Sequence, residues 1–520
     1  MFDKPMGGTE LMYEELMKRL PQFYKDRFSI FNYLPQADFS KTTVYWNQLS
    51  YDQEAVQALR NPELIEKIDH FVYVSNWQAE KFRQIFGIPG FKTEVIKNAC
   101  IGVGIRQAGP REKVKLCYVS TPWRGLDVLL DAWEILKPDN CELHVFSSCK
   151  IYGEDFANQS ENLYQHLYDR CLQLPGVVYR GSIPNEDLRR ELPSFDILAY
   201  PNTFEETSCI AVIEALSAGL RVVCSNIGAL PETTEGFARI YPYLVDKKLH
   251  AERFASILSY EIDYALKNKA ASLLNLQVNS YKPRWSWETR IYDWTGFLNK
   301  IVQDQINLDF QNLWDRQIFD EVYIDNEYGI STFEPDDVVL DLGCHIGSFS
   351  RLAYDNGSRK IIAFEANPDI YYRSKSRLPS EIEVINKAVW RSDEEPKVLK
   401  FDVNVVDGNG SMGKVFEGGE IEVKSIRLDD VLEKHETVRL IKIDVEGSEY
   451  EILFTSKKLE RVKVITGEFH EYPTTKQING YSLDRKGLQR YFEDLGWKID
   501  IKESDWSKEC GFFKAINLNF

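Results

Sequence analysis

The chain has 520 residues, of which 43% are hydrophobic and 28% charged, and its formal net charge is −17. This composition is typical of a folded globular protein of about three domains and excludes an intrinsically disordered chain. The negative charge argues against a nucleic acid partner, because a phosphate backbone requires basic surfaces.

Cysteine placement and hydropathy indicate the cellular environment. None of the nine cysteines lies in a C-x-x-C pair, and most occur in apolar runs such as residues 115–119 and 221–224. This pattern predicts buried thiols in a reducing compartment rather than disulfides or a zinc site. No apolar run approaches the roughly 18 residues of a membrane span, and the N-terminus lacks the form of a signal peptide. We therefore expect a cytoplasmic protein without a membrane span.

Strand-like apolar runs alternate with helical patterns, which predicts α/β lobes with parallel sheets. The first series of runs comprises residues 43–46, 71–74, 95–96, 116–119, 143–146, 197–200 and 221–224, and the second comprises 338–340, 361–364, 384–385, 440–443 and 464–465. Between the two series, residues 257–314 are helical in pattern. We predict three Rossmann-like lobes, at residues 1–108, 109–303 and 304–520.

The first lobe begins unusually. Gly7 and Gly8 predict a turn before a helix over residues 10–20, with Thr9 available as the N-cap. A Rossmann lobe normally has a strand before such a turn, yet only five residues precede Met6. The lobe therefore either lacks its first strand or is a reduced version.

Residues 197–225 are the most informative part of the first half. A strand, a polar turn, a helix and a second strand follow one another closely. The helix N-terminus near Ser208, Cys209 and Ile210 presents free amides and about half a positive charge, which suits a diphosphate. Glu214, two turns beyond Thr207, can reach an adjoining ribose.

This segment resembles the retaining family 4 glycosyltransferases of the GT-B fold. Their mark is a pair of glutamates separated by seven residues, here Glu206 and Glu214. Further similar segments are residues 74–77, 95–98, 118–126 and 228–232. The resemblance implies that Glu206 faces the donor sugar, Glu214 binds the nucleotide ribose and Arg124 lies at the diphosphate. Gly8 would then belong to a loop for the acceptor or a sugar phosphate.

Two features differ from that family. Many members place an arginine and a lysine at the diphosphate, whereas this loop offers only Arg124. A histidine often follows the hydrophobic strand of the N-lobe, where this chain has Asn47 and Gln48. Taken alone, the glutamate pair also fits a solvated helix face, and Gly7-Gly8 fits an ordinary turn.

The second half opens with a glycine loop. Asp341, Gly343 and Gly347 form a D-x-G-x-x-x-G pattern after a buried strand, and glycines allow the backbone to approach a ligand. Glu365 ends the next strand, 24 positions after Asp341, where a carboxylate can bind a ribose diol. Such a loop also fits NAD or FAD enzymes, but this spacing favours a methyl donor.

Two later segments complete the pattern. Residues 386–389 follow a third strand, where adenine contacts are expected, and residues 440–449 end a fourth strand with several acids. Together with residues 364–368, 426–432 and 467–470, these segments resemble the FkbM family of methyltransferases. The resemblance implies O-methylation with S-adenosylmethionine. The expected cofactor-binding residues are Asp341, Gly343, His345, Gly347, Glu365, Asn367 and Ala388, with His345 packing the loop.

An alcohol acceptor needs a base for its proton. Asp444, Glu468 and His470 are the candidates, and His470 is the first choice because its ordinary pKa lies near 6.5. Asp444, Glu446 and Glu449 could hold Mg²⁺. Glu446 and Glu449 more readily satisfy backbone or surface groups, so we predict no metal.

The leading hypothesis is a bifunctional enzyme of glycan synthesis. It would use a GDP- or UDP-sugar to glycosylate a glycan or glycolipid acceptor, and S-adenosylmethionine to methylate a sugar hydroxyl. An alternative keeps only the methyltransferase active, with the first half as a glycan-binding module. A scaffold without either activity is a third hypothesis, against which the two sets of site residues count.

Overall fold

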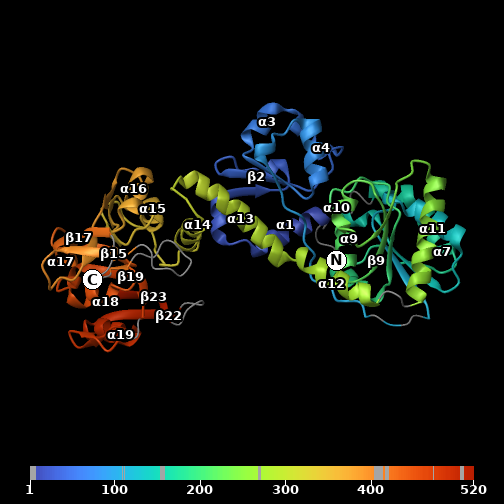
Figure 1. The fold of residues 1–520 in the computed structure, drawn as a ribbon. Helices are drawn as coiled ribbons and strands as arrows, with labels where there is room; N and C mark the ends of the chain where they lie inside the picture. Colours follow the sequence, from blue (N-terminus) through green and yellow to red (C-terminus); the bar gives the residue numbers. More distant parts are fainter. Residues whose placement is uncertain are drawn as a thin grey trace. The chain divides into compact units, whose positions relative to one another are not determined.

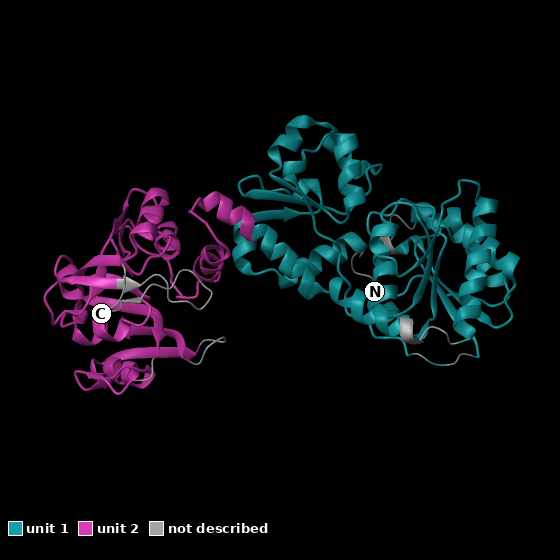
Figure 2. Cartoon of the chain, in the orientation of Figure 1, with its two compact units in different colours: residues 1–298 teal, residues 299–520 magenta. Residues whose placement is uncertain are grey.

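The structure is a computed structural model, and it describes residues 7–107, 109, 112–152, 158–267, 271–402, 414–415, 421–471, 474–503 and 509–520. The chain forms two compact units, residues 1–298 and 299–520 (Figure 2). Helix α13 (Trp287–Ile306) contains the division between them. The predicted α/β class is confirmed, because the large sheets consist mainly of parallel strands.

The first sheet of the first unit is parallel, in the order β1-β2-β3-β4. Its elements are β1 (Phe28–Phe31), β2 (Thr42–Asn47), β3 (His70–Tyr73), β4 (Thr93–Val95), α1 (Gly8–Arg19), α2 (Gln22–Arg27), α3 (Pro62–Lys67) and α4 (Asn76–Phe86). Helix α1 begins at Gly8, with Gly7 at the N-cap and no side-chain capping bond, so the expected cap by Thr9 is wrong. Met6, part of the predicted turn, lies outside the described residues.

The second sheet of this unit is also parallel, in the order β10-β9-β8-β5-β6-β7. Its strands are β5 (Val114–Val119), β6 (Cys141–Phe146), β7 (Val177–Tyr179), β8 (Ile197–Tyr200), β9 (Arg221–Ser225) and β10 (Arg239–Tyr241). Its helices are α5 (Leu126–Leu136), α7 (Gln165–Gln173), α8 (Asn185–Glu191), α9 (Ile210–Ser217), α10 (Leu230–Thr234), α11 (Lys247–Leu266) and α12 (Ala271–Arg284). Figure 1 shows α9 and α12 on one side of this sheet and α7 and α11 on the other.

The main sheet of the second unit has the order β13-β12-β11-β18-β19-β23-β22. Its strands are β11 (Val338–Leu342), β12 (Lys360–Phe364), β13 (Ile382–Ile385), β18 (Val438–Ile443), β19 (Val462–His470), β22 (Trp497–Glu503) and β23 (Cys510–Asn517). The first five run parallel, and β23 and β22 add an antiparallel edge. Numbered within the sheet, the order is 3-2-1-4-5-7-6, so the strand order reverses between the parallel neighbours β11 and β18.

The helices of the second unit are α14 (Leu313–Phe319), α15 (Ser348–Asp355), α16 (Pro368–Arg377), α17 (Leu428–Leu432), α18 (Glu449–Thr455) and α19 (Arg485–Asp494), with a π-helical turn at Asp320–Ile324. Two small sheets were not predicted. They contain β14 (Ala388–Trp390), β15 (Val398–Asp402), β16 (Lys414–Val415), β17 (Ile421–Arg427), β20 (Gln477–Ile478) and β21 (Tyr481–Ser482).

All nine cysteines are buried and free, as predicted. Cys117 on β5 and Cys224 on β9, for example, belong to the hydrophobic core around the second sheet of the first unit. Among the described helices, none is both long enough and apolar enough to cross a membrane.

Candidate functional site

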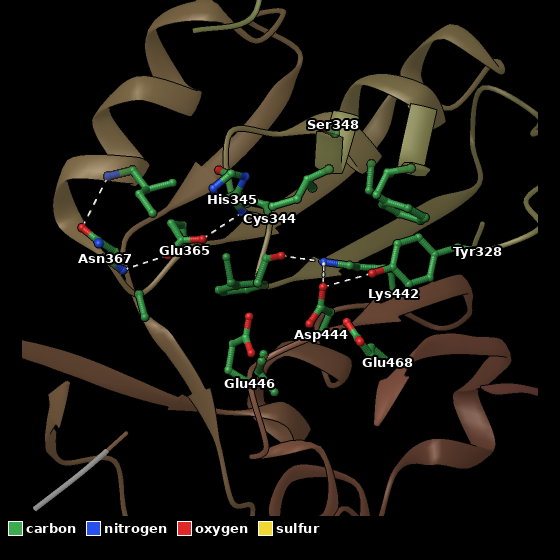
Figure 3. Close-up of a pocket in the computed structure, with 18 of the residues that line it drawn as sticks. Tyr328, Cys344, His345, Ser348, Glu365, Asn367, Lys442, Asp444, Glu446 and Glu468 are labelled. Carbon is green, nitrogen blue, oxygen red and sulfur yellow. Dashed lines mark hydrogen bonds and ion pairs between the residues drawn. The ribbon is translucent and has the colours of Figure 1, made fainter. Parts of the chain in front are cut away.

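A cavity of about 490 Å³ lies in the second unit, beside the carboxyl ends of β11, β12, β18 and β19 (Figure 3). The strand order of the sheet reverses at this point, and open α/β sheets bind their ligands there. The predicted residues that line the cavity are Gly343, His345, Glu365, Asn367, Ala388, Asp444 and Glu468. Asp341, Gly347 and His470 are not among its lining residues.

The glycine loop follows β11 closely. Gly343 has φ of +80°, and a Cβ atom there would lie 1.9 Å from the carbonyl oxygen of Asp444. Gly347 has φ of +95° and directly precedes α15. Only glycine tolerates both the left-handed backbone and the close approach at position 343. At Gly343 the loop therefore exposes backbone atoms, without a side chain, to the cavity.

Asp341 lies beneath this loop and is fully buried. Its Oδ2 accepts a hydrogen bond from the Ser350 hydroxyl at 2.6 Å. Burial raises the pKa of Asp341, and the nearby charge of Lys442 opposes that rise. Asp341 therefore stabilises the start of the loop and does not line the cavity.

Glu365 follows β12 directly and lines the cavity next to the glycine loop. Its carboxylate accepts backbone hydrogen bonds from His345 and Asn367, both at 2.9 Å. Burial raises its pKa to about 6. Asn367 caps α16 by accepting from the Asp369 amide at 2.9 Å. Glu365 is thus held with a fixed orientation at the edge of the cavity.

His345 is part of the glycine loop, and its side chain lies near Asp315. It has φ of +50°, and its Nε2 lies 3.4 Å from Asp315 Oδ1. Burial lowers its pKa to about 4. The ring is therefore neutral near pH 7, and only its backbone amide contacts Glu365.

Several cavity residues were given no role from the sequence, among them Lys442 and Tyr328. Lys442 Nζ donates to the carbonyl of Gly343 at 2.6 Å and lies 3.4 Å from Asp341 Oδ1 and 3.7 Å from Asp444 Oδ2. The Tyr328 hydroxyl donates to Asp444 Oδ2 at 3.0 Å (Figure 3). Lys442 thus joins the glycine loop to the acids after β18. A lysine inside the apolar run 440–443 was the signal available in the sequence.

The acids after β18 and the end of β19 surround His470. Its Nδ1 lies 3.2 Å from Glu449 Oε1, and its Nε2 lies 3.5 Å from Glu446 Oε2 and 3.9 Å from Glu468 Oε1. Burial alone would lower the pKa of His470, but the charge and hydrogen bond of Glu449, with the other acids, raise it to about 11. A histidine protonated near pH 7 cannot accept a proton, so its surroundings argue against His470 as the base.

Glu449 serves the backbone, as expected. Its Oε1 accepts from the amides of Val445 and Gly447 at 3.1 and 3.0 Å, which stabilises the turn between β18 and α18. Glu446, in contrast, lines the cavity. Burial and then the charge of Asp444 raise the pKa of Glu446 to about 7, and that of Glu468 to about 9.

Asp444, Glu468 and His470 form a group that could hold a metal ion, since one ligand atom of each lies within 4.8 Å of the others. This set differs from the Asp444, Glu446 and Glu449 set considered in the sequence. Carboxylate and imidazole ligands suit several divalent cations. The expected absence of a metal stays a prediction.

In the first unit, the loops after β5 and β8 meet. A Cβ atom on Gly125 (φ +113°) would lie 2.2 Å from the carbonyl oxygen of Pro201. Arg124 Nη1 lies 3.1 Å from Glu206 Oε1, and the Tyr200 hydroxyl donates to the same oxygen. Glu206 is only 4% exposed and Arg124 is half-buried, so the predicted diphosphate and sugar residues form an ion pair with each other.

Helix α9 begins at Ile210 with Cys209 at its N-cap, so Glu214 lies little more than one turn into it. This corrects the expected two turns. Glu214 is 7% exposed and lies 3.8 Å from Arg189 Nη1, and burial raises its pKa to about 7. Ser208 is also buried, and its Oγ has no hydrogen-bond partner among the described residues.

The turn at Gly8 reaches the same helix. A Cβ atom on Gly8 would lie 2.8 Å from Ile210 Cδ1. The Thr207 hydroxyl donates to the carbonyl of Gln48 at 2.9 Å, and the Tyr51 hydroxyl donates to Glu205 at 2.7 Å. The predicted nucleotide-sugar residues thus lie where the two lobes of the first unit contact each other.

Comparisons with known proteins match two separate parts of the chain, one in each compact unit. Residues 113–260 match the family model described as glycosyl transferases group 1, and residues 341–497 match the methyltransferase FkbM domain. The O-antigen chain mannosyltransferase B of Escherichia coli is 22% identical over 183 residues, which are 33% of this chain and 46% of that protein. The matched region thus spans less than half the length of this curated relative.

Two solved structures illustrate the structural similarity. A sucrose-phosphate synthase from Thermosynechococcus elongatus is 18% identical, with 56% of this chain and 80% of that chain covered and a TM-score of 0.40. HepE of Anabaena, in complex with UDP-glucose, is 17% identical, with 50% and 73% covered and a TM-score of 0.38. On the two family matches, the chain contains a group 1 glycosyltransferase domain followed by an FkbM methyltransferase domain.

Proposed function

We propose that the second unit methylates a sugar hydroxyl with S-adenosylmethionine. The observation that carries this proposal is the cavity of about 490 Å³ at the switch point of the sheet. Its volume lies within the roughly 300–1,000 Å³ of small-molecule sites. The fit is supported by the bare backbone at Gly343 and by the oriented carboxylate of Glu365.

The cavity residues divide into two groups by position (Figure 3). Glu365 would bind the ribose hydroxyls, Asn367 and Ala388 would border the adenine, and Gly343 and His345 would face the methionine part through their backbone. When bound, S-adenosylmethionine supplies a methyl group on a sulfonium. The opposite end of the cavity, with Asp444 and Glu468, would receive the acceptor hydroxyl.

Asp444 is the base that the geometry favours. It lines the cavity, and its Oδ2 is oriented by the Tyr328 hydroxyl and by Lys442. Asp444 Oδ1 is buried and has no hydrogen-bond partner among the described residues, so it can accept a hydroxyl proton. Glu468, whose pKa is raised to about 9, is protonated near pH 7 and orients the acceptor instead.

A direct test measures methyl transfer from labelled S-adenosylmethionine to glycans and glycolipids from cells that make the protein. We expect a product in which the labelled methyl group has replaced one hydroxyl hydrogen. Calorimetry should show binding of S-adenosylmethionine, and Glu365→Ala should weaken it by about 1–3 kcal/mol. Equal affinity of Glu365→Ala and the parent protein would contradict the assigned ribose site.

We also propose that the first unit transfers a sugar, with retention of configuration, from a GDP- or UDP-sugar to a glycan or glycolipid in the cytoplasm. The N-terminus of α9 would face the diphosphate, Arg124 would pair with it, and Glu214 would bind the ribose. Arg124 would have to leave Glu206 for the diphosphate, which would free the Glu206 carboxylate to face the donor sugar.

A second candidate is a glycan-binding role for the first unit. The ion pair of Arg124 and Glu206 favours it, because a donor must disrupt a pair that is already formed. An assay with the whole protein distinguishes sugar transfer from glycan binding. It measures the UDP or GDP released from a UDP-sugar or GDP-sugar. Glu206→Gln should abolish release, whereas Glu252→Gln, an exposed position on α11, should not. Undetectable release by the parent protein with every donor would favour the binding module.

A further inference from the structure

Part of the wall of the methyltransferase cavity precedes the matched FkbM domain in the chain. Helix α14 contributes Trp314, Gln317 and Ile318 to the cavity, whereas the family match begins only at residue 341. Asp315 lies between these residues in the sequence, is fully buried and is not among the lining residues. A buried carboxylate needs partners, because water no longer solvates its charge. The contacts of Asp315 therefore indicate its role.

One oxygen of the Asp315 carboxylate has two hydrogen-bond donors. Its Oδ2 accepts from the side chain of Arg373 and from the backbone amide of Gln311, the latter at 2.8 Å. Arg373, on α16, also donates to the carbonyl of Asp309 at 2.6 Å. These contacts hold the carboxylate in one orientation between α14 and α16.

The other oxygen of Asp315 faces the ring of His345. Oδ1 lies 3.4 Å from Nε2 of His345, yet neither this oxygen nor either ring nitrogen has a hydrogen-bond partner among the described residues. Buried polar atoms in folded proteins nearly always have a partner. His345 lines the cavity beside Glu365, away from Asp444 (Figure 3). The unpaired atoms therefore lie where a bound ligand can complete their hydrogen bonds.

The surroundings of His345 determine which ring nitrogen carries hydrogen. Burial lowers the pKa of His345 to about 4, against the charge of Asp315, so the ring has a single N–H near pH 7. A carboxylate only accepts hydrogen bonds, so the N–H belongs on Nε2, which faces Asp315. Nδ1 is then an acceptor without hydrogen, and it suits a ligand group that can donate.

We propose that Nδ1 of His345 accepts a hydrogen bond from the α-ammonium group of the methyl donor, and that Asp315 is the positioning residue that keeps the ring hydrogen on Nε2. This inference rests on the proposed methyltransferase function. Each ribose hydroxyl has one hydrogen, which Glu365 would accept, whereas the ammonium group has three. The donor's carboxylate only accepts and cannot pair with Nδ1.

Two ligands with the same adenosine part test the contact. S-adenosylhomocysteine has the ammonium group, whereas 5′-methylthioadenosine lacks the whole amino acid part. In calorimetry with the whole protein, His345→Ala should raise the dissociation constant of S-adenosylhomocysteine at least tenfold. The dissociation constant of 5′-methylthioadenosine should change less than threefold, which also shows that the variant is folded. Equal losses for the two ligands would overturn the assigned contact with the ammonium group.

Asp315→Asn tests the positioning role. Its amide oxygen would keep the contacts with Arg373 and Gln311, so its NH₂ group would face His345 and move the ring hydrogen to Nδ1. Nitrogen-15 NMR of labelled histidine should show this change of tautomer, and the dissociation constant of S-adenosylhomocysteine should rise at least fivefold. Asp304→Asn, an exposed position on α13, should change neither. A ring hydrogen that stays on Nε2 in Asp315→Asn would overturn the positioning role.

A double variant shows whether Asp315 acts through His345. In the His345→Ala background, Asp315→Asn should cause less than a twofold further loss of S-adenosylhomocysteine affinity, because the ring that it orients is absent. Additive losses would mean that Asp315 acts by another route, and they would overturn the proposal. Failure of both ligands to bind the parent protein would instead overturn the proposed methyltransferase function.

Discussion

Asp444 and His470 lie close together, yet their side chains contact different groups. Asp444 accepts from Tyr328 beside Lys442, whereas His470 contacts Glu449, Glu446 and Glu468. We expect Asp444→Asn to lower the single-turnover rate of methyl transfer by roughly 10²–10⁴, the usual contribution of a general base. His470→Gln should lower it less than tenfold, because the imidazolium only balances the charge of neighbouring acids.

Binding of S-adenosylmethionine is the control for both variants. Asp444→Asn should keep the donor affinity within about tenfold, so that the lost rate reports chemistry. If His470→Gln lowers the single-turnover rate a hundredfold while Asp444→Asn stays active, His470 is the base and Asp444 is not.

We predict that Glu214 lowers the free energy of unfolding at high pH. Its pKa rises from the ordinary 4.5 to about 7 on folding, because burial disfavours the charged form. The folded state therefore binds the proton more tightly, and this stabilisation is complete below pH 4.5 and lost as the pH rises to 7. Glu214→Gln should stabilise the first unit by up to about 3 kcal/mol at pH 8 and change little at pH 4.5.

Thermal unfolding at the two pH values checks this, with Glu252→Gln as the exposed control. The same Glu214→Gln variant should bind a UDP- or GDP-sugar more weakly, which is the signature of a binding residue kept at the expense of stability. Equal shifts in unfolding temperature at pH 4.5 and pH 8 would show that folding does not change the pKa of Glu214.

Site residues that belong to a short sequence motif could be predicted. Site residues that meet only through the fold, from distant parts of the chain, could not. Gly343 and Glu365 stand in a short pattern at strand ends, and both line the cavity. Tyr328 lies 116 residues from Asp444, and no local pattern links them. The protonation of His470 likewise depends on Glu449, which is 21 residues away, so its ordinary pKa was a poor guide.

Among elements, the turn after β11 depends on one glycine. Gly343→Ala would place a methyl group 1.9 Å from the Asp444 carbonyl, at a φ of +80°. We expect Gly343→Ala to lose most S-adenosylmethionine binding and to lower the unfolding temperature of the second unit. Gly496→Ala is a matched control, since its φ is +74° but a Cβ there meets nothing within 4 Å. Equal effects of the two variants would show that backbone strain alone, not the close approach, matters.

Complete burial made some strands predictable, but β1 (Phe28–Phe31) is also completely buried and was missed, because Ser29 interrupts its short apolar run. β8 (Ile197–Tyr200) is completely buried, so it appears in the sequence as an apolar run. β22 (Trp497–Glu503) alternates buried or half-buried with exposed residues at the edge of its sheet, and was missed. Its alternating pattern was a usable signal for a strand with one solvated face. β14 has only three residues, too few for any periodicity.

At the scale of the whole molecule, α13 belongs to both units. Trp294 packs against Trp46 in the first unit, whereas Asn299 and Gln303 donate to Asp320 in the second, at 2.9 and 3.0 Å. A fragment of residues 299–520 should therefore fold and bind S-adenosylmethionine within a few-fold of the whole protein. A fragment of residues 309–520 loses both bonds to Asp320 and should unfold at least roughly 5 °C lower.

Thermal unfolding of the two fragments, with and without S-adenosylmethionine, measures the difference. Equal unfolding temperatures would mean that the end of α13 contributes nothing to the methyltransferase domain. An insoluble 299–520 fragment would contradict the proposed independence of the second unit.

The burial of every cysteine has a practical consequence for experiments on this chain. Alkylating dyes react with exposed thiolates, and burial both hides the thiols and raises their pKa, as at Cys224, where it reaches about 12. The nine native positions can therefore stay unmutated in a labelling experiment. Cysteines introduced at exposed Glu252 and Glu334, one in each unit, would take the dyes selectively, and energy transfer between them would report the distance between the two domains while either one turns over.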